Sequence, residues 1–193
     1  MRRIGFVSIF VALSATVTTS ALADIDSATA DCDEGWDLDS HPEAQTTPSS
    51  EFTEMESGEV VRHEATGLEW RRCPEGMEWD GETDDCTGDS DQMTWQEALK
   101  HADEIDDWRL PDINELSSIV EYCRNEPAIN EKVFPNTPIS GLDGDRYWSA
   151  SPSSRVTQGT ANQTWYVGFE DGERSADGRG MNNRLRLVRE GEE

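Results

Sequence analysis

Short polar side chains gather in the last third of the chain, in stretches rich in Gly, Ser and Asn. Their carboxylate and amide oxygens suit Ca²⁺ or the hydroxyl groups of a sugar, and an arginine beside them suits a carboxylate on a ligand. The residues of this kind are Asp143, Asp145, Asn162, Arg179, Asn182 and Asn183. We predict that they form a binding surface, although Asp, Asn and Gly are equally the residues of ordinary solvated turns.

Catalytic chemistry has little support in the sequence. The three His stand in no recognisable motif, and there is neither a nucleophile elbow nor a zinc signature. The acidic stretch 31–39 resembles a calcium loop, but its glycine is misplaced and no glutamate closes it. We therefore expect no catalytic residues and no cofactor, with Ca²⁺ as the one ion to consider. A hydrolase built from residues distant in sequence remains an alternative.

The four cysteines divide into a close pair and a remainder. Cys73 and Cys86 flank a stretch of Gly, Pro and acidic residues, which predicts a local disulfide that closes a polar loop. By elimination Cys32 pairs with Cys123. Zinc is the alternative, but no second close pair exists and the histidines are scattered.

The seven tryptophans invite a comparison with sugar-stacking platforms. Core packing is the stronger interpretation for those in predicted strands, helices or corners, because large aromatic side chains dominate protein cores. These are Trp70, Trp95, Trp108, Trp148 and Trp165. Trp79, inside the loop between Cys73 and Cys86, is the best candidate for an exposed aromatic residue.

The chain begins like an exported protein. Residues 1–23 have two arginines, an apolar run too short to span a bilayer comfortably, and a small-x-small ending, which predicts a signal peptide cleaved after Ala23. We expect a secreted or periplasmic protein without a membrane span. Residues 24–58 read as an acidic, largely irregular arm, residues 59–190 as one domain, and residues 191–193 as a tail.

The charge limits the partners. Residues 24–193 hold 14 basic and 41 acidic residues, a formal charge of −27. A field of this sign repels nucleic acid and sulfated polymers.

The stretch 107–123 is the element around which the domain is organised. Pro111 disfavours helical geometry at Leu110, so the chain enters a helix from an extended segment, with Trp108 and Leu110 on its apolar side. Asp112 and Glu115 have the spacing of a capping box, and apolar residues continue at helical spacing to Cys123. Arg109 needs a partner or water. A first helix is predicted over 95–103, capped by Thr94. Strands are predicted over 59–63, 68–72, 147–150, 164–169 and 184–189.

Several motifs together resemble a known bacterial family. They are Thr66-Gly-Leu-Glu-Trp70, Thr94-Trp-Gln-Glu-Ala98, Asp107-Trp-Arg-Leu-Pro111 with Glu115-Leu116, Pro127-Ala-Ile-Asn130, Phe134-Pro-Asn-Thr137, Tyr147-Trp-Ser149 and Arg186-Leu-Val-Arg189. The chain resembles the Lcl C-terminal domain family, named after the end domain of a collagen-like bacterial adhesin. The resemblance implies an α+β, C-type lectin-like fold, in which two helices flank a small, mostly antiparallel sheet with long loops.

The resemblance also implies a function outside catalysis. The adhesin's end domain implies glycan binding and homo-oligomers, although that relative favours sulfated polyanions, which a charge of −27 should repel. The fold is related to formylglycine-generating oxidases, yet the late thiol pair that those enzymes use for copper has no counterpart here. We therefore expect a recognition or adhesion module that binds a glycan or a cell-surface protein. A structural surface protein without a discrete ligand is the alternative.

Overall fold

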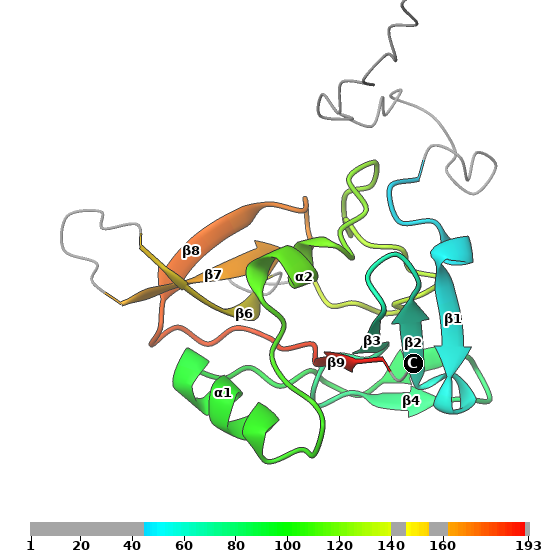
Figure 1. Cartoon of the computed structure of the whole chain (residues 1–193), viewed down its shortest axis with the longest axis horizontal. Helices are drawn as coiled ribbons and strands as arrows, with labels where there is room; N and C mark the ends of the chain where they lie inside the picture. Colours follow the sequence, from blue (N-terminus) through cyan, green and yellow to red (C-terminus); the bar gives the residue numbers. More distant parts are fainter. Residues whose placement is uncertain (1–44, 140–145, 155–161, 192–193) are drawn as a thin grey trace, which may run out of the picture.

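The computed structural model describes residues 45–139, 146–154 and 162–191 (Figure 1). Residues 1–44, and with them the predicted signal peptide, Cys32 and most of the predicted arm, lie outside this range, as do Asp143, Asp145 and residues 192–193. The described residues form a mixed α+β structure with antiparallel sheets. The helices are α1 (Trp95–Asp103) and α2 (Ile113–Ser117), with short 3-10 turns η2 (Ser49–Glu51) and η3 (Glu56–Gly58). The strands are β1 (Phe52–Met55), β2 (Val60–His63), β3 (Leu68–Arg71), β4 (Glu78–Asp80), β5 (Asp85–Thr87), β6 (Arg146–Ser153), β7 (Gln163–Gly168), β8 (Arg174–Gly178) and β9 (Val188–Glu190).

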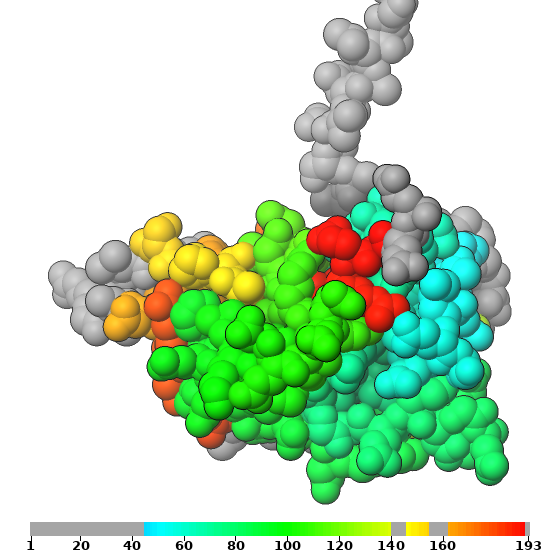
Figure 2. Space-filling model, turned by 60° about the horizontal axis from the view of Figure 1, so that its bottom comes forward, coloured from blue at the N-terminus to red at the C-terminus, as the bar shows by residue number. Residues whose placement is uncertain are grey.

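The first sheet joins the two ends of the described chain. Its order is β1-β2-β3-β9, and each neighbouring pair is antiparallel. The strands predicted over 59–63 and 68–72 are confirmed as β2 and β3, which form an antiparallel hairpin with Gly67 at a positive φ of 72° in its turn. Figure 2 shows the red C-terminal residues at the surface between the cyan N-terminal strands and the green region that contains the helices.

The second sheet has the order β6-β7-β8 and is also antiparallel. The strands β6 and β7 were predicted over 147–150 and 164–169, and β6 is longer than predicted. The strand β8 was predicted as part of a loop, which is wrong: its Arg-Ser-Ala-Asp-Gly sequence lacks apolar alternation, and backbone pairing with β7 forms the strand instead. The strand predicted over 184–189 is shorter than expected, and in this part of the chain the strand β9 covers Val188–Glu190.

The core confirms the packing interpretation for Trp70, Trp95, Trp108 and Trp148, whereas Trp165 is only partly buried and belongs to neither core cluster. Trp70 and Trp148 are fully buried, and Trp108 and Leu110 at the predicted corner are 9% and 3% exposed. Trp95 is partly buried against the same cluster as Trp108 and Trp148. Large aromatic side chains thus contribute to both hydrophobic clusters of the core, as expected from the apolar area that they bury.

The corner places Arg109 in an ion-pair network. Its guanidinium donates to both carboxylate oxygens of Glu115, at 2.7 and 2.8 Å, and to Glu190 at 2.6 Å. Glu115 also accepts the backbone N–H of Asp112, which completes the predicted capping box. These hydrogen bonds hold the pKa of Arg109 above its usual range. Arg109 therefore ties the start of α2 to the C-terminal strand β9.

The helix α2 is shorter than predicted. It ends at Ser117, and the segment through Cys123 is not helical, although Ile119 and Val120 are buried as their spacing required. The hydroxyls of Ser117 and Ser118 donate to the carbonyls of Ile113 and Glu115, at 2.5 and 2.7 Å. Serine side chains that bond to the backbone in this way compete with helix propagation.

Residues 45–58, assigned from sequence to the arm, carry regular structure that packs on the domain. The strand β1 extends the first sheet. Ahead of it, the buried carboxylate of Glu121 accepts hydrogen bonds from the backbone N–H and hydroxyl of Thr46, from those of Thr47, and from the N–H of Cys123. We refer to Thr46, Thr47 and Glu121 as the N-terminal anchor.

The buried His63 makes the stability of the first sheet depend on pH. Its ring stacks on Phe52 of β1, with centroids 4.6 Å apart. Burial lowers its pKa from 6.5, while Glu51, 3.6 Å away, and Glu64 oppose that shift. Below about pH 6.5 His63 is therefore protonated more readily in the unfolded chain than in the folded protein. The free energy of unfolding should consequently fall as the pH drops below about 6.5. Denaturant unfolding at several pH values should show this slope, and the slope should be smaller in His63→Gln. An equal slope in the variant would contradict the assignment to His63.

The disulfide between Cys73 and Cys86 is present, as predicted, with Cα atoms 5.5 Å apart. It closes a hairpin of β4 and β5, where the sequence had suggested only a polar loop. On the chain-entropy model a bridge over this separation contributes about 3 kcal/mol, so the Cys73→Ser, Cys86→Ser variant should lose stability by that order. Peptide mapping without reductant should return this pair and the pair Cys32–Cys123, whose first member lies outside the described residues. Free thiols in freshly exported protein would contradict both pairings.

Candidate binding site

Three segments distant in the sequence meet where β8 ends. The backbone N–H of Arg179 donates to the carbonyl of Asn162, at 3.2 Å, just before β7. The carbonyl of Arg179 in turn accepts the N–H of Trp95, the first residue of α1, at 3.2 Å. The structure therefore brings Asn162 and Arg179 together, as the sequence predicted, and adds Trp95. We call Trp95, Asn162, Arg179, Met181 and Asn182 the Arg179 surface.

The side chain of Arg179 is held in place from two directions. Its guanidinium lies over the Trp95 ring, 4.2 Å from the centroid. Its Nε donates to the hydroxyl of Thr164, at 3.2 Å, and Thr164 itself is fully buried. Within the described residues its two terminal nitrogens have no hydrogen-bond partner. Both are therefore available as a fixed pair of donors.

The predicted amide ligands separate into exposed and buried ones. Asn162 and Asn182 are exposed, whereas Asn183 is fully buried and its backbone pairs with Met93. The amide oxygen and nitrogen of Asn183 have no partner among the described residues. Asn183 thus lies in the interior and does not present its amide at the surface. The predicted ligands Asp143 and Asp145 lie outside the described residues.

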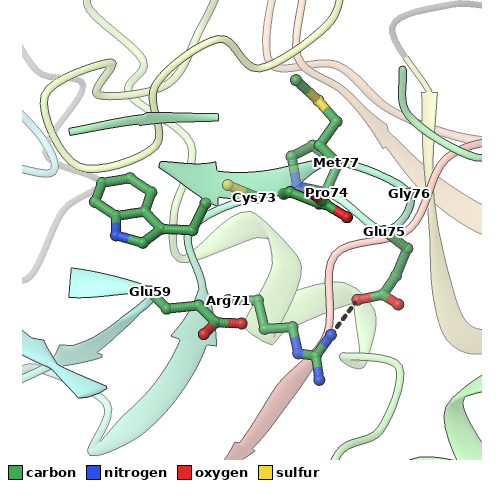
Figure 3. A pocket seen from close by; sticks show the side chains of 9 residues that line it. Glu59, Arg71, Cys73, Pro74, Glu75, Gly76 and Met77 are labelled. Atoms are coloured by element: carbon green, nitrogen blue, oxygen red, sulfur yellow. Dashed lines mark hydrogen bonds and ion pairs between the residues drawn. The ribbon is translucent and has the colours of Figure 1, made fainter. Parts of the chain in front are cut away.

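A cleft of about 310 Å³ opens beneath the β4–β5 hairpin, away from the Arg179 surface (Figure 3). Its lining includes Glu59, Arg71, Glu75, Met77 and Trp79. Figure 3 shows Glu59, Arg71 and Glu75 on one side of the cleft, with Arg71 bonded to Glu75 at 3.1 Å. We call it the Glu75 cleft.

Trp79 is not a free stacking platform. The guanidinium of buried Arg72 lies 4.1 Å from its ring centroid, and its indole N–H donates to the carbonyl of Ser57. Arg72 also donates to the carbonyls of Val133, Gly58 and Lys132. Trp79 is consequently half-buried and covers Arg72, and at most part of it faces the cleft.

Sequence reasoning missed the carboxylate–imidazole pair beside this cleft. Glu75 is 6% exposed, and its second carboxylate oxygen lies 2.7 Å from Nε2 of His101. The two residues are 26 positions apart, and neither stands in a motif, so no sequence signal marked them. Among the described residues no group of three or more His, Cys, Asp or Glu is arranged to hold a metal ion, and no helix is long and apolar enough to cross a membrane.

The comparison with protein families decides the assignment. The model of the Lcl C-terminal domain matches residues 59–189. The chain belongs to the Lcl C-terminal domain family. No curated protein matches the chain.

The match places the candidate site within the family domain. The Arg179 surface, the Glu75 cleft and the Cys73–Cys86 hairpin all lie in the part of the chain that the Lcl C-terminal domain model covers. The strand β1 and the anchor residues Thr46 and Thr47 lie before the matched region, whereas Glu121, which they contact, lies within it.

Proposed function

We propose that the chain is an exported, non-catalytic recognition module with a C-type lectin-like fold, and that it binds a glycan through the Arg179 surface. One observation carries the proposal: Arg179 is fixed by Trp95 and Thr164, while its terminal nitrogens are left without a protein partner in the described structure. A donor pair held in one geometry loses little conformational entropy on binding, which favours recognition of oxygen acceptors.

The surface composition supports a polar ligand. Among the described residues the large hydrophobic side chains that remain exposed are Tyr122 and Met181. Protein partners usually bind through a buried core of aromatic and aliphatic side chains surrounded by polar groups. The Arg179 surface instead offers a guanidinium, two amides and the thioether of Met181, a set that suits sugar hydroxyls.

The Glu75 cleft favours a non-catalytic role. The pair of Glu75 and His101 resembles a base with its orienting carboxylate, but covalent catalysis by such a pair also needs a nucleophilic side chain within reach. The residues that line the cleft include no serine or threonine, and Cys73 is held in a disulfide. Glu75 is also bonded to Arg71, so a structural role in joining α1 to the β4–β5 hairpin accounts for the pair.

The experiment is a glycan array on the exported protein, with and without Ca²⁺. We expect saturable binding to a limited set of non-sulfated glycans. Asp143→Ala with Asp145→Ala, tested in parallel, reports whether Ca²⁺ or these carboxylates take part. No binding in either condition would contradict the proposal and favour a protein partner or a structural role.

A further inference from the structure

Among the described residues, Arg179 differs from three other half-buried arginines of this acidic chain in having no carboxylate partner, although the buried arginines Arg184 and Arg186 are also held by hydroxyl or carbonyl groups. Three other half-buried arginines have carboxylate partners: Arg109 pairs with Glu115, Arg146 with Asp177, and Arg189 with Glu69. The sequence supplies 41 acidic residues for 16 basic ones. Even so, within the described structure Arg179 is fixed by an aromatic ring and a hydroxyl and has no carboxylate partner.

We infer that the ligand of the Arg179 surface is a sugar that carries one carboxylate, such as a uronic acid residue, and that Arg179 binds this carboxylate through both terminal nitrogens. The inference rests on the proposed function and narrows it to one ligand class. A planar guanidinium matches the two oxygens of a carboxylate, and bidentate pairs of this kind are stronger than bonds to neutral hydroxyls.

The surroundings favour an anionic group at this point. Two acidic side chains close in sequence to Arg179 or Trp95 are already engaged, since Asp177 pairs with Arg146 at 3.0 Å and Glu97 is bonded to Thr94 in the capping box. The N-terminus of α1 lies at Trp95, directly beside Arg179, and its partial positive charge adds to that of the guanidinium.

The net charge of the chain restricts the ligand to a single carboxylate. At physiological salt, exposed charges separated by more than about 8 Å are largely screened. One carboxylate at Arg179 therefore experiences mainly the local positive charge. A polyanion that extends across the surface meets the excess of carboxylates elsewhere, so sulfated polymers should bind poorly.

The test is isothermal titration of the full exported chain with matched pairs of oligosaccharides. Each pair consists of a sugar with one glucuronate, galacturonate or sialate residue and the same sugar after reduction of the carboxylate to an alcohol. We expect one acidic sugar to bind and its reduced form to bind at least about tenfold more weakly, because hydrogen bonds to a charged group are lost. Arg179→Gln should weaken binding of the acidic sugar by about 10- to 100-fold, and Arg179→Lys by an intermediate factor.

Arg174→Gln is the matched control, because it removes the same charge from an exposed arginine at the start of β8. It should leave the affinity within about twofold, as expected for a screened surface charge. Should Arg179→Gln alter the near-ultraviolet circular dichroism, Thr164→Val provides a second variant. It removes the acceptor of the Arg179 Nε without touching the ligand, and it should also weaken binding.

The outcomes separate the inference from the proposed function. Equal binding of the acidic and reduced sugars, or equal affinities of Arg179→Gln and Arg174→Gln, would overturn the inference while glycan recognition stands. Binding of a peptide with a free terminal carboxylate, but of none of the sugars, would overturn both. Tight binding of a heparin oligosaccharide in preference to the sugars with one carboxylate would overturn the restriction to a single charge.

Discussion

Glu121→Gln should cost about 3 kcal/mol of folding free energy, because it replaces one buried acceptor oxygen by an NH₂ group that faces hydrogen-bond donors. The Glu121 carboxylate is fully buried and accepts from the backbone and hydroxyl groups of Thr46 and Thr47, at 2.8 to 3.1 Å. An amide keeps one acceptor oxygen and places an NH₂ group against the remaining donors. Leaving a buried donor unsatisfied costs roughly 1 to 3 kcal/mol.

Two measurements check this prediction. Denaturant unfolding gives the loss of stability, and hydrogen exchange should show that the amides of Thr46 and Thr47 lose protection before the rest of the domain. Glu131→Gln is the control, because it removes the same charge from an exposed side chain. A stability equal to that of Glu131→Gln, with these amides still protected, would show that the anchor does not hold the N-terminal segment.

Trp108→Ala should destabilise the domain by roughly 3 to 5 kcal/mol, the usual range for deletion of a core aromatic residue. Trp108 is 9% exposed, and the guanidinium groups of Arg71 and Arg189 pack on its ring, with their Cζ atoms 5.0 and 4.6 Å from the ring centroid. The substitution removes the apolar area of the corner and leaves both arginines without an aromatic surface.

Chemical denaturation checks this value, and Trp108→Phe should recover a large part of the loss because it keeps an aromatic ring. Met181→Ala serves as the surface control and should change stability by less than about 0.5 kcal/mol. A loss below about 1 kcal/mol in Trp108→Ala would mean that Trp108 contributes no more than an ordinary surface residue.

Local signals in the sequence predicted much of the fold. Both capping boxes were visible, because the bonds of Thr94 with Glu97 and of Asp112 with Glu115 span only three residues. The disulfide of Cys73 and Cys86 was visible because its spacing is short. The buried corner at Trp108 followed from its apolar spacing and from Pro111.

Contacts between distant residues were not visible in the sequence. The strand β8 has no apolar pattern and exists through its pairing with β7. The helix α2 ends at Ser117, where the hydroxyls of Ser117 and Ser118 bond to backbone carbonyls. The prediction followed the apolar spacing, which continues beyond this point, and did not account for these bonds. Glu121 and Thr47 are 74 positions apart, so the anchor leaves no local trace.

The candidate site was predicted in part. Asn162 and Arg179 were identified as polar loop residues, and the structure places them together. Trp95 was assigned to the core, and its second role under the Arg179 guanidinium required the tertiary structure. Asn183 was grouped with them by composition, although the bridge to Met93 turns it into an interior residue.

The most direct test of the recognition site is a ¹H–¹⁵N NMR titration of the labelled protein with the glycan that binds best on the array. Two indole groups serve as internal reporters, because Trp95 Nε1 donates to Ser149 beside the Arg179 surface and Trp79 Nε1 donates to Ser57 beside the Glu75 cleft. We predict saturable shifts of the Trp95 indole, the Arg179 side chain and the Thr164 amide, with the Trp79 indole unchanged. Shifts that centre on Trp79 and leave Trp95 and Arg179 unchanged would contradict the assignment of the site.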